Sequence, residues 1–227
     1  MVRSLEPLWR LTPAYQKSLA QFARHDHVKG PWIASVEFSK DGVNQVFPQY
    51  VDLIPPAFTV GGVIPSFFDS LLGNKYVNRP IGAIAMRRDI QEAFTSTERR
   101  FIVAHEYSHI MMNHWPMALL GPVLGDIAGS VISGMKDDTV KSALQVILPL
   151  AKVLASIRFT RQSEIDSDLH AMKLVGSKST AESTIRKLAR IIDDDNLDVP
   201  THYVFVDGAA VGVLTYRDRL NQISNAK

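Results

Sequence analysis

The chain contains no cysteine among its 227 residues. Disulfide bonds and thiolate metal sites are therefore excluded, and a metal ion could be held only by histidine and carboxylate side chains. Lys and Arg, 25 in total, nearly balance the 23 Asp and Glu, and no run of Lys and Arg exceeds two residues. Because nucleic-acid-binding proteins carry a basic patch, this composition predicts no nucleic-acid partner.

A secretion signal is also lacking, because residues 1–16 (MVRSLEPLWRLTPAYQ) hold no uninterrupted apolar stretch of the required length. We therefore expect a cytoplasmic protein. Its 46% of hydrophobic residues can bury one substantial core. We expect an N-terminal extension at residues 1–30 and a single domain at residues 31–227.

Residues 101–114 (FIVAHEYSHIMMNH) carry the most informative motif, H-E-x-x-H. His105 and His109 are four residues apart, so on a helix both imidazoles lie on one face and can converge on one metal ion. Glu106 lies beside that face, so its carboxylate can reach a water on the ion and take its proton. The alternative is a surface helix that carries two histidines by chance.

The surrounding residues have the signals of a helix. Thr95 and Glu98 have the spacing of a capping box, which predicts the helix start, and Pro116 marks the expected end.

A second motif lies in residues 158–175 (RFTRQSEIDSDLHAMKLV), where apolar residues recur at helical spacing (Ile165, Leu169, Met172). Glu164 and Asp168 are four residues apart beside this apolar stripe. Two like charges at this spacing cost a few tenths of a kcal/mol on an isolated helix, and a cation in front of them reverses the sign. Glu164 could complete a His-His-Glu site, and Asp168 could accept the free N–H of a ligand imidazole. The alternative is a solvated acidic face.

Together the two motifs resemble the gluzincin metallopeptidases, in which H-E-x-x-H is followed by E-x-x-x-D on a later helix. The segments AHEYSHIMMNH and RFTRQSEIDSDLHAMKL are similar to the HtpX-like and CAAX-prenyl-protease-like branch. The resemblance implies one zinc ion with His105, His109 and Glu164 as ligands, Glu106 as the general base and Asp168 as the partner of a ligand imidazole.

The resemblance also implies an α+β, zincin-like fold with a small mixed sheet, an edge strand over the active-site helix and a mostly helical C-terminal half. His114 falls where the branch often has a histidine, and we interpret it as structural. Residues 214–223 (LTYRDRLNQI) are faintly similar to the H-P-x-x-x-x-R-I segment, which aligns Arg219.

The apolar run at residues 81–86 (IGAIAM) precedes the motif helix. In the resembled enzymes the strand at this place is an edge strand that lines the cleft. Gly82, Ala83 and Ile84 would then accept an extended peptide by strand addition. An ordinary buried strand is the alternative.

Two apolar segments, at residues 117–135 and 140–157, separate the two motifs. Each is interrupted by charge, the first by Asp126 and the second by Lys141 and Lys152, which disfavours a membrane span. We expect a helical hairpin at residues 117–157 packed on the domain, with membrane contact as the alternative. Other expected elements are strands at 32–38, 46–54 and 203–206, and helices at 13–22, 66–72, 180–192 and 216–223.

These expectations lead to a zinc-dependent endopeptidase with a protein or peptide substrate. The candidates for a second oxyanion donor or substrate contact are His202, Tyr203, Tyr216 and Arg219. One alternative is a regulatory protease that cuts one particular intracellular protein. Another is a zinc-bound or metal-free binding module without catalysis, although such a module has no need of Glu106. The sequence predicts no oligomeric state.

Overall fold

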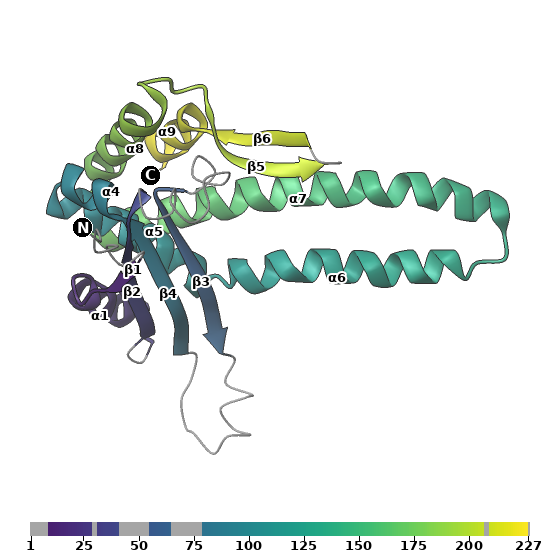
Figure 1. Ribbon diagram of the computed structural model, residues 1–227, viewed down its shortest axis with the longest axis horizontal. Coiled ribbons are helices and arrows are strands. Elements are labelled where there is room, and N and C mark those ends of the chain that lie inside the picture. The colour runs from purple at the N-terminus through teal and green to yellow at the C-terminus, as the bar shows by residue number, and fades with distance from the viewer. Residues whose placement is uncertain (1–8, 29–30, 41–54, 65–78, 207–208, 227) are drawn as a thin grey trace, which may run out of the picture.

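The computed structural model describes residues 9–28, 31–40, 55–64, 79–206 and 209–226, drawn as ribbon in Figure 1. The expected strand at 46–54 and the expected helix at 66–72 lie outside these ranges. The architecture is mixed and mostly helical, with two small sheets.

A mixed four-stranded sheet has the order β1-β2-β4-β3. The strands are β1 (Trp9–Leu11), β2 (Trp32–Phe38), β3 (Ala57–Ile64) and β4 (Arg79–Arg87). β2 and β4 are parallel, whereas β1 pairs antiparallel with β2 and β3 pairs antiparallel with β4.

The strand that contains Gly82, Ala83 and Ile84 is β4, and it is hydrogen-bonded on both sides, by β2 and by β3. The expected edge position of these residues is therefore wrong. Within this interior strand Ile84 is fully buried. Among the described residues β3 forms this edge of the sheet.

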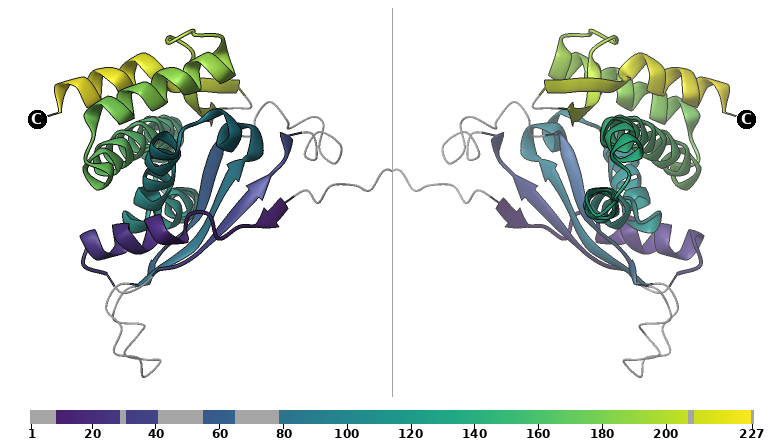
Figure 2. Two further views of the ribbon diagram at one scale, coloured as in Figure 1. Left: turned by 90° about the vertical axis from the view of Figure 1, so that its left-hand side faces the viewer. Right: turned by 90° about the vertical axis from the view of Figure 1, so that its right-hand side faces the viewer.

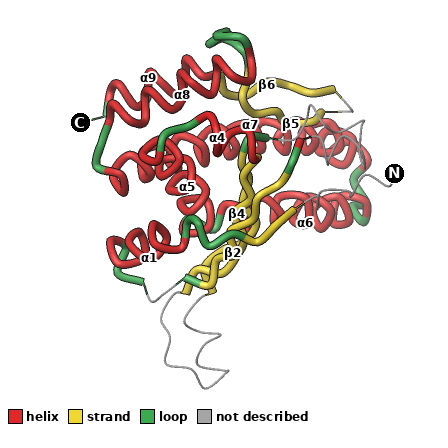
Figure 3. The backbone as a smooth tube through the Cα atoms, turned by 60° about the vertical axis from the view of Figure 1, so that its left-hand side comes forward, coloured by secondary structure: helices red, strands yellow, loops and turns green. Residues whose placement is uncertain are grey.

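Helix α5 (Ser96–Met111) lies against the sheet and is the centre of the molecule (Figure 3). It begins at the expected capping box, in which the side chains of Thr95 and Glu98 each accept from the other's backbone N–H. It ends before Pro116, because Asn113 has a φ of +56° and turns the chain. Pro116 instead lies in the first turn of α6 (His114–Ser133), where its missing N–H costs nothing.

Within the expected extension at 1–30 the structure describes residues 9–28, and these contact the sheet and the core. The domain boundary at residue 30 stays a prediction. β1 is a strand of the sheet, and α1 (Gln16–His25) packs on the core through Leu19, Phe22 and Ala23. These three residues lie at i, i+3 and i+4, so one face of the helix is buried.

The C-terminal half is mostly helical, as expected. After α4 (Arg88–Ala93), α5 and α6 come α7 (Asp138–Val175), α8 (Lys178–Asp193) and α9 (Tyr216–Asn225). Strands β5 (Pro200–Val206) and β6 (Ala209–Thr215) pair antiparallel and lie beside α7 (Figure 1).

A helical hairpin is present between the motifs, but it projects from the body of the molecule instead of packing on it (Figures 1 and 2). We call α6 together with residues 138–157 of α7 the apolar arm. Among the described side chains of the arm, several large apolar ones are exposed, including Val146, Ile147, Leu150 and Leu154. An 18-residue window of α7 has a mean hydropathy of 1.5, is apolar and long enough for a membrane span, and has none of its residues buried.

Candidate metal centre

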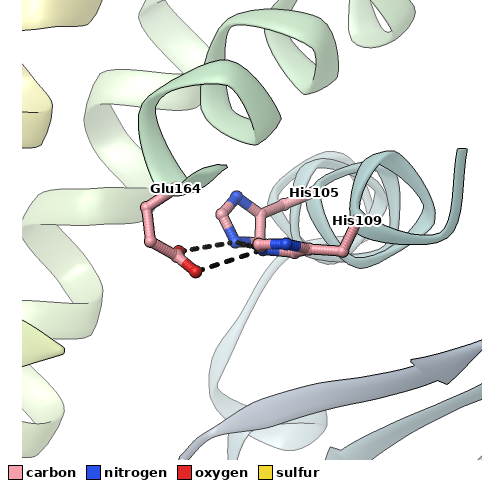
Figure 4. Close-up of side chains that lie close together, drawn as sticks. All are labelled: His105, His109 and Glu164. Carbon is pink, nitrogen blue, oxygen red and sulfur yellow. Dashed lines mark hydrogen bonds and ion pairs between the residues drawn. The ribbon is translucent and has the colours of Figure 1, made fainter. Parts of the chain in front are cut away.

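Two helices bring the predicted ligands together (Figure 4). His105 and His109 project from α5, and Glu164 faces them from α7. The two ring Nε2 atoms are 3.1 Å apart. Glu164 places Oε2 3.2 Å from Nε2 of His105 and Oε1 3.3 Å from Nε2 of His109.

These separations fit a metal ion. Atoms that bind a tetrahedral zinc ion at about 2.0–2.1 Å are about 3.3–3.4 Å from each other. Oε2 of Glu164 is buried and accepts no hydrogen bond, although a buried carboxylate oxygen ordinarily has a donor. A cation between the three side chains would satisfy it. Three protein ligands leave a position open, as catalytic zinc sites do.

Asp168 orients the first ligand. Its Oδ1 lies 2.8 Å from Nδ1 of His105, and an ionised carboxylate can only accept, so Nδ1 carries the hydrogen and Nε2 presents its lone pair to the site. Arg219 of α9 binds the same carboxylate through Nε and Nη2, both at 2.7 Å. The predicted role of Asp168 therefore has a geometric basis, and Arg219 acts behind it.

His114 orients the second ligand in the same way. Its Nδ1 lies 2.8 Å from Nδ1 of His109. Burial, together with the nearby His109, lowers the pKa of His114 to about 4, so its ring is neutral and can accept the N–H of His109. That donation leaves Nε2 of His109 free for a metal.

The charges of the centre depend on burial and on its ion pairs. Burial lowers the pKa of His105, but the charge of Asp168 and its hydrogen bond outweigh this and raise it to about 10. Burial raises the pKa of Asp168, but the charge and hydrogen bonds of Arg219 outweigh this and lower it to about 2. Burial likewise opposes ionisation of Glu164, yet the surrounding imidazoles hold its pKa well below the ordinary value. A metal ion and a proton therefore compete for Nε2 of His105.

Glu106 lines two adjoining cavities beside the ligands, and the larger, of about 620 Å³, forms a cleft. One wall is β3, with Phe58 and Thr59, and the other is the β5–β6 hairpin, with Tyr203 and Ala210. Burial is the main cause that raises the pKa of the Glu106 carboxyl above its ordinary value. The edge strand that lines the cleft is thus β3, in place of the expected residues 82–84.

Of the four candidates for substrate contact, His202 reaches the ligands. Its Nε2 is 3.2 Å from Oε2 of Glu164, and its Nδ1 is 2.9 Å from Oγ1 of Thr201. Burial lowers the pKa of His202 to about 4, against the pull of Glu164, so the ring is neutral.

The other three candidates lie farther from the ligands or are occupied. Tyr203 lines the outer part of the cleft and is 47% exposed, so it can contact a substrate. Tyr216 is buried in the inner cavity, where burial and the neighbouring Asp193 raise the pKa of its hydroxyl. Arg219 is paired with Asp168. Burial lowers the pKa of the guanidinium, but the ion pair with Asp168 outweighs burial, so the pKa is raised.

A buried network behind α5 escaped the sequence analysis. Ser108 Oγ lies 2.9 Å from Nδ1 of His170, and Nε2 of His170 lies 3.2 Å from Oδ1 of Asp26. Ser108 is fully buried and its Oγ donates to the Ala104 carbonyl, so the network connects α5 and α7 to Asp26, the residue that follows α1. No spacing signal links residues 62 and 144 positions apart.

Comparison with known proteins agrees with the geometry. The model described as "Peptidase family M48" matches residues 73–217, more than half of the chain. A "Protease HtpX homolog" of Sulfurovum sp. (strain NBC37-1) is 29% identical over 140 residues, which are 55% of this chain and 50% of the relative. The chain thus spans about half the length of the curated relative it matches, and no solved structure matches it. The resemblance to the HtpX-like branch is confirmed, and the chain belongs to peptidase family M48.

Proposed function

We propose that this protein is a zinc-dependent endopeptidase with Glu106 as its general base. The observation that supports this most strongly is the convergence of His105, His109 and Glu164 on one point in the cleft that Glu106 also lines. A zinc ion held there would polarise the scissile carbonyl and lower the pKa of water.

Glu106 accepts the proton of the attacking water and returns it to the leaving amine. Burial raises its pKa, which makes it a stronger base than an exposed glutamate. Burial of the Glu106 carboxylate, which is 7% exposed, costs free energy. A site that only binds metal does not require this carboxylate. This cost disfavours the binding module without catalysis.

The residues around the ligands position them. Asp168 and His114 fix the ring nitrogens of His105 and His109 that face the site, and Arg219 holds Asp168. His202, the candidate nearest to the ligands, donates a hydrogen bond to the substrate carbonyl oxygen as negative charge develops on it.

The substrate backbone binds along β3. This strand uses one edge to pair with β4, and Phe58 and Thr59 line the cleft on its other side. An extended peptide adds to such an edge through main-chain hydrogen bonds. These bonds are independent of the side chains of the substrate, so the edge can bind peptides of different sequence. An edge strand above the motif helix is the arrangement that we propose as zincin-like.

The test compares Glu106→Gln with the parent on a peptide library, with and without a chelator. We expect chelator-sensitive cleavage by the parent and none by the variant, with equal zinc content and equal thermal stability. Glu92→Gln, on the exposed face of α4, is the matched control and should cleave normally. Cleavage by Glu106→Gln would refute the assignment of the base.

The position of His202 has its own test. His202→Ala should lower kcat by about 10²–10³-fold while zinc content is retained, since one oxyanion donor contributes this much. A variant that loses zinc would show that His202 serves the metal and not the substrate. If the parent cuts no library peptide but cuts one intracellular protein, the regulatory alternative is favoured.

A further inference from the structure

Asn113 lies in the turn between α5 and α6, and its side chain reaches the strand that forms one wall of the cleft. Its Oδ1 accepts a hydrogen bond from the backbone N–H of Val63 in β3, at 2.6 Å. The two residues are 50 positions apart in the sequence, so this bond connects the end of α5 to a separate element of the fold.

The amide of Asn113 is available for this bond because it does not cap α6. Asn113 is the N-cap residue of that helix, yet its side chain makes no capping hydrogen bond. An N-cap asparagine ordinarily accepts from the backbone N–H of the second or third helical residue. The third residue of α6 is Pro116, which has no N–H, so one of these two donors is missing.

The backbone of Asn113 also places the next residue. Its φ of +56° lies in the left-handed region, which asparagine adopts more readily than most other residues with a side chain. His114 follows directly, and its Nδ1 lies 2.8 Å from Nδ1 of His109. Residues 113 and 114 therefore connect β3 on one side to a metal-ligand candidate on the other.

The bond is made at the edge of β3 that faces away from β4, which we call the outer edge. Val63 lies opposite Pro80, which has no N–H, and the N–H of Val63 donates to Asn113 instead of to β4. The main-chain groups of alternate residues in an antiparallel strand point to the same side. Those of Thr59 and Gly61 therefore also point to the outer edge, and Thr59 lines the cleft.

We propose that Asn113 is a positioning residue, which fixes the outer edge of β3 relative to His109. This inference rests on the proposed function, because it requires a peptide that adds to β3 and is cut at the metal centre. Without the bond, β3 stays paired with β4 but its outer edge loses this anchor to the end of α5. A peptide then pairs less well with β3, whereas Glu106 and the metal ligands act on a bound peptide as before.

The test separates KM from kcat. Asn113→Gly removes the amide and keeps the turn, since glycine adopts a positive φ without strain. We expect KM for a peptide that the parent cleaves to rise about 3–10-fold, which corresponds to the net loss of one hydrogen bond. The kcat and the zinc content should stay at the values of the parent. Asn113→Asp keeps an acceptor and tolerates the same backbone, so it should restore the KM of the parent.

Asn196 offers a matched control. Its Oδ1 accepts from the backbone N–H of Asp198 at 3.1 Å, in the exposed connection between α8 and β5, and it lines neither cavity. Asn196→Gly removes the same kind of bond and should change neither KM nor kcat. A variant that merely folds less well loses active molecules, which lowers the apparent kcat and leaves KM unchanged.

Peptide binding without turnover gives an independent measurement. In a Glu106→Gln background, Asn113→Gly should weaken peptide binding in calorimetry by the same factor of about 3–10, and Asn113→Asp should not.

The possible failures are distinguishable. If the parent shows chelator-sensitive cleavage but Asn113→Gly keeps its KM, this inference is wrong and the proposed function stands. A lower kcat or zinc content at unchanged KM would also overturn the inference, because Asn113 would then serve the metal centre alone. So would a raised KM in Asn113→Asp, where the acceptor is present. A parent without chelator-sensitive cleavage would refute the proposed function and this inference together.

Discussion

Asp168→Asn tests the arrangement that holds His105. The carboxylate is 1% exposed on its side chain and serves three donors, Nδ1 of His105 and two nitrogens of Arg219. Asparagine has nearly the same shape but no charge, and its NH₂ group must face one of these donors. The variant therefore loses at least one hydrogen bond and leaves the guanidinium of Arg219, 8% exposed, without its counter-ion.

The expected magnitudes follow from this burial. Removal of one partner of a buried ion pair costs about 3–5 kcal/mol, and because asparagine keeps one acceptor we expect the lower end, about 3 kcal/mol. For a chain of this size that corresponds to a fall of roughly 6–12 °C in melting temperature. Loss of the partner of a ligand histidine lowers metal affinity about 10–100-fold.

The two effects are measured separately. Thermal unfolding with a chelator reports the ion pair alone, and zinc titration of the folded protein reports the orientation of His105. Asp166→Asn, two residues away on α7, removes the same charge from a less buried side chain that accepts a hydrogen bond from Gln162, and should change both values little. An unchanged melting temperature would refute the burial argument. Unchanged zinc affinity beside a lowered melting temperature would show that Asp168 does not orient His105.

Three other perturbations have defined outcomes. Removal of zinc by a chelator should lower the melting temperature of the parent by roughly 5–10 °C, because ligand at 100 times its Kd stabilises by about 2.7 kcal/mol; no shift would mean that the folded chain does not bind zinc. Gly82→Ala should lower both stability and cleavage, since a Cβ there would overlap the Val60 carbonyl and displace β3. Peptide binding as strong as that of the parent would contradict the role of β3. Glu98→Gln should cost about 0.3–1 kcal/mol at pH 7 in urea unfolding, because the amide keeps the capping-box bond but loses the charge that faces Lys187 and the positive end of the helix. Burial raises the pKa of Glu98, but hydrogen bonds of the capping box and from Lys187 outweigh this and hold it below its ordinary value. That stabilisation is present above the unfolded-state pKa of about 4.3 and lost as the pH falls through the lower folded-state pKa, so the difference between parent and variant should disappear on acidification.

Local signals in the sequence predict the metal helix well. The capping box at Thr95 and the four-residue spacing of His105 and His109 depend on contacts within one helix, where the geometry is fixed. The four-residue spacing of Glu164 and Asp168 beside an apolar stripe makes them candidates, and the family pattern assigns them to the histidines, since no rule of spacing connects an acid to a histidine 55 or more residues away.

Strand order and the cleft walls could not be predicted in this way. Whether β4 or β3 lies at the edge depends on which strands pair across loops, and the apolar run at residues 81–86 suits either position. His202 lines the cleft because β5 lies beside α7. The residues next to His202 in the sequence give no signal of this contact between β5 and α7. The cytoplasmic location stays a prediction.

Helix α7 connects the apolar arm to the metal centre. The same uninterrupted helix carries Glu164 at the metal centre and Leu154 on the apolar arm, ten residues or about 15 Å apart. A continuous helix transmits orientation, because its backbone hydrogen bonds resist bending and Pro149, the residue most able to kink it, lies on the far side of Leu154 from the centre. The position of the ligand carboxylate therefore depends on the straightness of α7 next to the centre. A proline at Ile157, between arm and centre, would kink the helix there. It should reduce cleavage by separating Glu164 from the two histidines.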